Sequence, residues 1–152
     1  MKLIVTKFGG TSVGTIDRIK SVATRIKKEV NNGYNVIVVV SAMAGETNRL
    51  IKLVESLTND YRTSEYDTVI SSGEQVTSGL LAIALNELGI KSKSYQGWQI
   101  PFETDNNFSK ANIKEIKQDK ILFELNDGYV IVVPGFQGVY QNRVTTLGRG
   151  GS

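Results

Sequence analysis

A short loop near the amino terminus carries residue types suited to binding phosphate. It reads Lys7-Phe8-Gly9-Gly10-Thr11-Ser12 and directly follows a short apolar run. Two glycines let main-chain amides approach an anion, and we expect Thr11 and Ser12 to open a helix whose amino end favours negative charge. With the Lys7 ammonium beside them, these groups predict a phosphate site. A tight glycine turn capped by serine, with Lys7 in solvent, fits the same residues.

Two further loops would bring polar groups to the same place. Ser41 follows an unbroken β-branched run, Val36 to Val40, so its hydroxyl would lie at the end of a strand. Ligands of parallel α/β sheets gather outside the carboxyl ends of the strands, so residues 7–14, 41–47 and 135–138 are expected to meet there. Thr47 either caps the next helix or touches the ligand, and capping is the commoner role.

Two charged side chains could recognise a ligand or serve structure only. Glu74 lies in Ser72-Gly73-Glu74-Gln75 between two helical stretches. A carboxylate at such a position often only complements the helix dipole. Arg149 lies in the glycine-rich segment from Thr145 to Ser152, where a guanidinium could fork onto a carboxylate. A disordered terminus and an RNA-binding Arg-Gly-Gly element are the alternatives there.

These loops need a framework of strands and helices. Strands are expected at residues 2–6, 36–40, 91–95 and 129–133. Helical spacing runs from Ile16 to Val30, over 50–57, over 65–88 with a break at 71–73, and more weakly over 111–125, while 97–102 is irregular or a hairpin. The fold class is therefore α/β, with a mainly parallel sheet and helices on both faces.

The composition limits the chemistry. The chain has 152 residues, enough for one domain, and its hydrophobic (40%) and charged (22%) contents are ordinary for a soluble globular protein. It contains neither cysteine nor histidine. Disulfides, thiolate metal sites and the usual general base are thus excluded, and we expect no metal ligands of these kinds. Any catalysis has to use lysine, arginine, carboxylates and main-chain amides.

The net charge of +3 is spread along the chain. The densest basic stretch, Lys20 to Lys28, alternates with apolar residues, so we interpret it as a solvated helix face and expect no nucleic-acid partner. No apolar run approaches the roughly 20 residues of a membrane span. The amino terminus shows no signal-peptide pattern either, so we expect a cytoplasmic protein without membrane contact.

Taken together, the motifs resemble those of the aspartate kinases in the amino-acid kinase family, along essentially the whole chain. They are Lys7 to Ser12, Ser41-Ala42-Met43, Ser72-Gly73-Glu74, Gly135-Phe136-Gln137-Gly138 and Thr145 to Ser152. Uridylate, carbamate, acetylglutamate and glutamate kinases share the fold, but the first and last motifs favour aspartate kinase. The resemblance implies phosphoryl transfer from ATP, with Mg²⁺, to L-aspartate. The product would be 4-phospho-L-aspartate, which begins lysine, methionine and threonine synthesis.

The resemblance also implies roles for individual residues. Lys7 would neutralise the transferring phosphoryl group, while four others would support its oxygens: Gly9, Gly10, Ser12 and Ser41. Glu74 resembles the residue that receives the α-amino group of aspartate, and Arg149 the one that pairs with its α-carboxylate. The same pocket would be lined by Thr47, Ser152 and Phe136. The acceptor carboxylate is already an anion at neutral pH, so no strong base is needed.

Measured against that family, residues 1–152 resemble only the amino-terminal, acceptor-binding portion of a catalytic domain, a truncated form of the fold. The nucleotide-binding half and the ACT regulatory domains have no counterpart in the sequence. We expect the chain to be inactive unless a homo-oligomer or a complementary carboxyl-terminal half completes the site. A non-catalytic remnant that binds aspartate or another anion is the alternative. An uncovered sheet edge and self-association are expected too.

Overall fold

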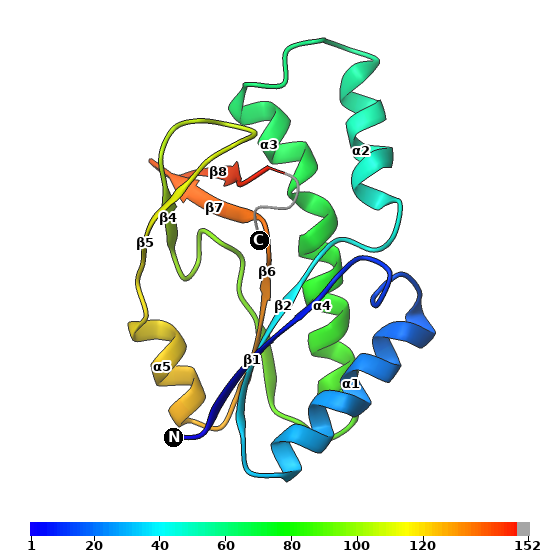
Figure 1. Ribbon diagram of the computed structural model, residues 1–152, viewed down its shortest axis with the longest axis vertical. Coiled ribbons are helices and arrows are strands. Elements are labelled where there is room, and N and C mark those ends of the chain that lie inside the picture. The colour runs from blue at the N-terminus through cyan, green and yellow to red at the C-terminus, as the bar shows by residue number, and fades with distance from the viewer. Residues whose placement is uncertain (149–152) are drawn as a thin grey trace.

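The described part of the chain begins with the predicted alternation of strand, helix and strand, and then has three helices, three strands, one helix and three strands in succession (Figure 1). The structure, a computed structural model, describes residues 1–148. Within that range the helices are α1 (Ile16–Asn31), α2 (Glu46–Glu55), α3 (Ser64–Ile70), α4 (Ser72–Glu87) and α5 (Asp119–Asn126). The strands are β1 (Leu3–Phe8), β2 (Asn35–Val40), β3 (Ser92–Ser94), β4 (Phe102–Thr104), β5 (Ile113–Ile116), β6 (Val130–Pro134), β7 (Gln137–Tyr140) and β8 (Arg143–Thr146).

The main sheet is parallel and has the order β1-β2-β6-β3. Its two central strands are the β-branched runs that the sequence marks as buried on both faces. Val38 and Val132 are partners in register, and both side chains are fully buried. Such runs suit a parallel sheet with both faces covered, because every side chain then meets an apolar neighbour. The expectation of a mainly parallel sheet is confirmed.

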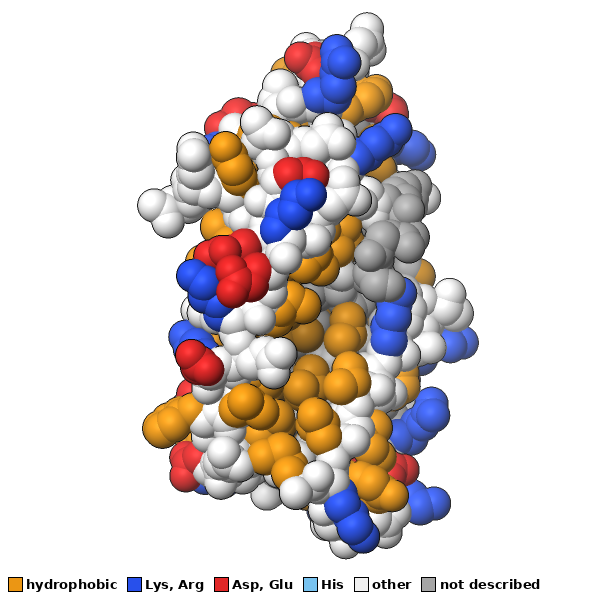
Figure 2. Space-filling view, turned by 60° about the vertical axis from the view of Figure 1, so that its left-hand side comes forward, with side chains coloured by type: hydrophobic (Ala, Val, Ile, Leu, Met, Phe, Trp, Pro, Cys, Tyr) orange, Lys and Arg blue, Asp and Glu red, His pale blue; other side chains and the backbone are white. Residues whose placement is uncertain are grey.

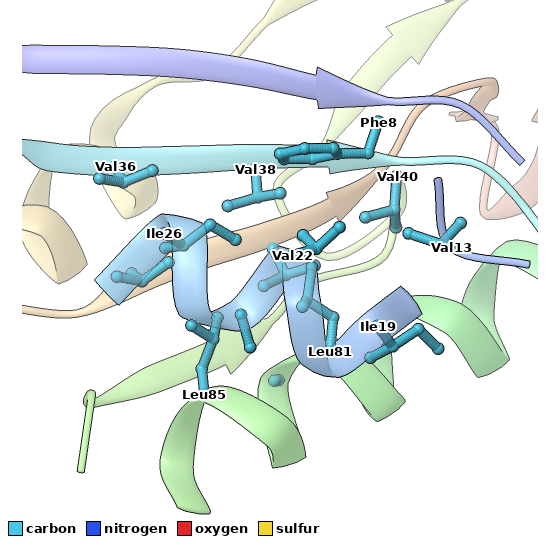
Figure 3. Close-up of a cluster of buried hydrophobic side chains, with 14 of the residues drawn as sticks. Phe8, Val13, Ile19, Val22, Ile26, Val36, Val38, Val40, Leu81 and Leu85 are labelled. Carbon is cyan, nitrogen blue, oxygen red and sulfur yellow. The ribbon is translucent and has the colours of Figure 1, made fainter. Parts of the chain in front are cut away.

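Helices α1 and α4 cover one face of this sheet. The α1 residues that face it recur every three or four positions, at Ile19, Val22, Ala23 and Ile26, and all are buried. They meet Val36, Val38 and Val40 of β2 on one side and Leu81 and Leu85 of α4 on the other (Figure 3). The Thr15 hydroxyl accepts a hydrogen bond from the Arg18 amide at 3.2 Å and so fixes where α1 begins.

The opposite face is covered by α5 and the segment after β3. Leu125 of α5 and Ile100 are buried against Ile131 and Val133 of β6, which confirms helices on both faces. This cover does not reach the edge strand β1, where Val5 keeps 60% of its surface exposed although it pairs in register with Ile37. Figure 2 shows hydrophobic side chains gathered on the surface of this side of the molecule.

A second, smaller sheet has the order β5-β4-β7-β8 and was not expected from the sequence. Strands β7 and β8 form a hairpin closed by Gln141 and Asn142, whose φ angles are 46° and 63°. Two consecutive positive φ values match the twist of a tight hairpin turn. The turn contains no glycine, so the usual sequence signal for it is missing.

Two local expectations were wrong. Residues 111–125 do not form one helix: Ile113–Ile116 is a strand paired with β4, and only Asp119–Asn126 is helical. The apolar spacing of Ile113 and Ile116 fits a helix, but pairing with β4 prevails. Thr11 and Ser12 also do not open a helix, because α1 begins at Ile16 and the Ser12 amide donates back to the Gly9 carbonyl at 3.0 Å.

Candidate functional site

A cavity of about 240 Å³ lies where β1, β2 and β6 end. It is lined by Gly10, Ser41, Ala42, Met43, Ala44, Gly45, Thr47, Asn48, Phe136 and Gly148. These residues come from three loops that follow parallel strands, from the first turn of α2 and from the segment after β8. Within residues 1–148 the lining side chains are hydroxyl, amide, apolar or absent, and none of them carries a charge. Such a cavity can orient a small polar ligand by hydrogen bonds, with charge supplied from its surroundings.

Glycine is required where the loops of the site press together. A Cβ at Gly10 would lie 3.0 Å from the Ala42 carbonyl oxygen, and one at Gly73 would lie 2.9 Å from the Ala42 side chain. Both distances are shorter than ordinary carbon contacts. The first loop and the start of α4 can therefore both pack against the loop after β2. This close packing brings Gly10 into the cavity wall.

Helix α2 begins at the edge of the cavity. Its N-cap is Gly45, with φ of +80°, and no side chain caps it. Thr47 is the second residue of the helix, so the expectation that it caps α2 was wrong. Its side chain instead lines the cavity beside that of Asn48. The amino end of a helix carries partial positive charge, which favours a negative ligand group here.

Glu74 lies in the first turn of α4 and is fully buried. Its Oε1 atom accepts hydrogen bonds from the amides of Gly135 and Phe136, both at 2.9 Å, and its Oε2 lies 3.5 Å from the Gln137 side-chain nitrogen. Burial raises the pKa of Glu74 to about 8, and the amide hydrogen bonds and the charge of Lys7 act against that rise. Glu74 thus holds the loop after β6 and interacts electrostatically with Lys7.

The loop that Glu74 holds carries the aromatic wall of the cavity. Phe136 lines the cavity and also packs against the cluster of Leu50, Val54 and Ile70. Its carbonyl accepts a hydrogen bond from the Leu147 amide at 2.8 Å. The two ends of the β7–β8 hairpin are therefore joined, and Gly148 lies at the cavity beside Phe136.

The structure brings together part of the set named from the sequence. Four of those residues line the cavity: Gly10, Ser41, Thr47 and Phe136. Four others lie in the surrounding elements without lining it: Lys7, Gly9, Ser12 and Glu74. Arg149 and Ser152 lie outside the described residues.

Sequence reasoning assigned no role to Asn48 and Gly148, which also line the cavity. Asn48 is an ordinary residue type for the first turn of a helix, so its identity gives no signal. Gly148, with φ of +83°, was visible only as part of a glycine-rich segment. Its place in the cavity wall depends on the hairpin that precedes it.

Residues 1–148 contain neither a cluster of metal ligands nor a helix suited to spanning a membrane. No group of three or more acidic side chains there comes close enough to hold a metal ion. No helix in this part of the chain combines the length and apolar character that a bilayer crossing requires.

The fold and the site define a class of protein. The model of the amino acid kinase family matches residues 2–152, so the chain belongs to that family. It is 53% identical to an aspartokinase of Rickettsia felis and 51% identical to an aspartate kinase of Pseudomonas fluorescens, in each case over 100% of this chain. It spans only 39% and 38% of the length of those relatives.

A solved structure agrees with these relatives. The aspartate kinase from Synechocystis superposes with a TM-score of 0.79 at 38% identity, covering 100% of this chain and 25% of that one. The fold class inferred from the sequence is confirmed by this likeness.

Proposed function

We propose that this chain is the acceptor-binding portion of an aspartate kinase. In the whole reaction, ATP and L-aspartate give ADP and 4-phospho-L-aspartate, the first step towards lysine, methionine and threonine. The observation that carries the proposal is the identity of about one residue in two with aspartokinases along the entire chain. The three loops that meet at one cavity support it. Such an enzyme would work in the cytoplasm, where both substrates are available.

The residues around the cavity would bind and orient the acceptor. The Thr47 hydroxyl and the amino end of α2 would receive its negative groups. The α-amino group of aspartate would form a charge-assisted hydrogen bond with Glu74, and Arg149 would pair with the α-carboxylate. Ser152 would complete the acceptor pocket. The β-carboxylate is ionised at neutral pH, so a chain without histidine can still position its nucleophile.

The ammonium of Lys7 would neutralise the phosphoryl group as it moves to the acceptor. The main chain at Gly9 and Gly10, with Ser12 and Ser41, would support its oxygens. Phosphoryl transfer depends mainly on positioning and charge neutralisation, which these groups could supply.

The nucleotide and its Mg²⁺ need a second part of the protein. Residues 1–148 bring no group of acidic side chains together for a hard cation, and those of them that line the cavity are uncharged. These residues fit an acceptor anion and do not fit a Mg²⁺ site. We propose that a complementary carboxyl-terminal half, or a homo-oligomer, contributes the nucleotide site. The short span relative to full-length relatives supports this view.

Reconstitution tests the proposal. The purified chain is mixed with the carboxyl-terminal part of the Rickettsia felis aspartokinase that lies beyond the aligned segment, and aspartate-dependent ADP release is measured. We expect turnover in the mixture, none with either part separately, and loss of turnover with Lys7→Ala. A mixture that binds both substrates yet releases no ADP would overturn the enzymatic proposal.

A binding module without catalysis is the second candidate. It is favoured by the uncharged lining that the described residues give the cavity. Calorimetric titration of the chain with L-aspartate distinguishes the two candidates when set beside the reconstitution. Binding without turnover in any mixture would support the module, whereas turnover would eliminate it.

A further inference from the structure

Asp67 is a buried carboxylate to which the proposed reaction assigns no role. It lies in α3 and none of its surface is exposed. Its Oδ2 accepts the Thr146 amide at 2.8 Å, and its Oδ1 accepts the Thr146 hydroxyl at 2.9 Å. The Ser109 amide donates to both oxygens, at 3.0 and 3.1 Å. One side chain thus joins α3 to the end of β8 and to the loop before β5.

Hydrogen bonds offset the cost of burying this carboxylate. An isolated carboxylate away from water is strongly unfavourable, so it persists only with close donors. Burial raises the pKa of Asp67, and the hydrogen bonds from Ser109 and Thr146 oppose the rise. Bonds to a charged acceptor are stronger and more directional than neutral ones. Asp67 therefore fixes the positions of two main-chain segments.

Both segments that Asp67 holds lead to the cavity. Thr146 lies two residues before Gly148, which forms part of the cavity wall. The loop at Ser109 lies against the same glycine, because a Cβ at Gly148 would lie 3.2 Å from the Ser109 carbonyl oxygen. The end of β8, two residues before Gly148, and the surface against which Gly148 packs are thus fixed by one side chain.

Glu74 acts in the same way at the other end of the hairpin. It binds the amides of Gly135 and Phe136, just before β7, whereas Asp67 binds Thr146 at the end of β8. Two buried carboxylates, from neighbouring helices, thus fix the entry and the exit of one hairpin. Phe136 and Gly148, which lie next to these two ends of the hairpin, both line the cavity.

We propose that Asp67 is a positioning residue for the acceptor cavity, acting through Thr146 and Ser109 to place the wall at Gly148. The identity of the ligand, L-aspartate, rests on the proposed function. The effect of Asp67 on the position of Gly148 does not depend on that function. The substitution Asp67→Asn keeps the size of the side chain while turning an amide donor towards the donors of Thr146 and Ser109. It should displace Gly148 without touching the ligand.

The matched control is Glu124→Gln. Glu124 is also a buried carboxylate, but it binds Lys93 and Tyr95 on the α5 side of the main sheet, away from the cavity. Both variants lose a buried charge with its hydrogen bonds. Only Asp67→Asn should change the cavity.

Two measurements on the whole chain test the inference. In calorimetric titration with L-aspartate, Asp67→Asn should raise Kd by roughly tenfold or more, as expected when a wall is displaced, and Glu124→Gln should change it less than about twofold. In amide NMR, Asp67→Asn should shift the Gly148 resonance and speed exchange at Thr146 by about tenfold. The resonance of Gly10, across the cavity, should stay in place.

Equal effects of the two variants on Kd, or an unmoved Gly148 resonance in folded Asp67→Asn, would overturn the inference. If the native chain binds no L-aspartate, the acceptor proposal fails, while the NMR measurement still decides whether Asp67 places Gly148. If Asp67→Asn does not fold, Thr146→Val serves instead, because it removes only the hydroxyl donor. A Gly148 resonance that stays in place in Thr146→Val would then count against the inference.

Discussion

The Oε1 atom of Glu74 lies 2.9 Å from the main-chain nitrogen of Phe136, although 62 positions separate the two residues in sequence. Glu74 therefore has a structural partner whatever ligand occupies the cavity. Burial of this side chain is the main reason that its pKa is raised to about 8. This relationship leads to a prediction about pH.

The stability of the chain should fall as the pH rises through the range in which Glu74 loses its proton. The folded-state pKa, about 8, lies above the unfolded value of 4.5, so the folded state holds more protons between them. The contribution of Glu74 is thus fully present below pH 4.5 and is lost as the pH passes 8, with a slope of at most about 1.4 kcal/mol per pH unit.

Urea denaturation at a series of pH values measures this dependence. Glu74→Gln keeps an oxygen for the Phe136 amide but cannot ionise, so its curve should be flatter than that of the native chain. Parallel curves for the two proteins would show that Glu74 does not titrate in this range.

Lys7 should lower the pKa of Glu74. Its positive charge favours the ionised carboxylate, and it is one of the causes that oppose the effect of burial. We expect Lys7→Ala to raise the pKa of Glu74 further, as followed by carboxyl carbon NMR during titration. Lys2→Ala is the control: it removes a lysine just before β1, whereas Lys7 lies near the end of that strand. It should leave the pKa of Glu74 unchanged. An unchanged titration in Lys7→Ala would refute the coupling.

A methyl group at Gly73 should disturb the loop after β2. The new Cβ would lie 2.9 Å from the Ala42 side chain, so the loop or the start of α4 must shift. We expect Gly73→Ala to lower the unfolding free energy by about 1–3 kcal/mol. Gly79→Ala, in the same helix with nothing within 4 Å of the new Cβ, should instead raise it by about 0.5–1 kcal/mol. Thermal unfolding of the two variants tests this prediction. Equal changes in the unfolding free energy of both variants would exclude the clash at Gly73.

The uncovered edge of the main sheet should cause self-association. Strand β1 pairs with β2 on one side, and Val5 leaves 60% of its surface exposed. An exposed apolar edge strand invites pairing with another chain, and a charge on it discourages pairing. In sedimentation velocity the chain should form dimers or larger species, and Val5→Lys should reduce them. Leu57→Lys, at an 89% exposed position after α2, is the control and should have little effect.

The sequence predicts the main sheet well because its signals are local. The unbroken β-branched run from Val36 to Val40 predicts a buried parallel strand. The spacing of apolar residues from Ile19 to Ile26 predicts which face of α1 is covered. The hairpin was missed for the opposite reason. Gln141 and Asn142 adopt the turn without a glycine, and the strand after it is held by donors and acceptors far away in sequence.

The same contrast explains what was found of the site. Gly10 and Ser41 follow strands whose ends can be predicted from the sequence. We could therefore expect both residues to lie at one cavity. The role of Glu74 in holding Phe136 and the burial of Asp67 depend on contacts between residues 42 or more positions apart in the sequence. No pattern within one segment reports such contacts.

The place of β6 in the main sheet has a consequence for the order of folding during synthesis. This strand lies between β2 and β3, so neither of those can complete its pairing until Val130–Pro134 has left the ribosome. Until then β1 and β2 can form with α1, but β3 has no neighbour. Contacts across such long separations in sequence slow folding. The nascent chain therefore remains a half-formed sheet, a potential substrate for chaperones, until Val130–Pro134 has emerged.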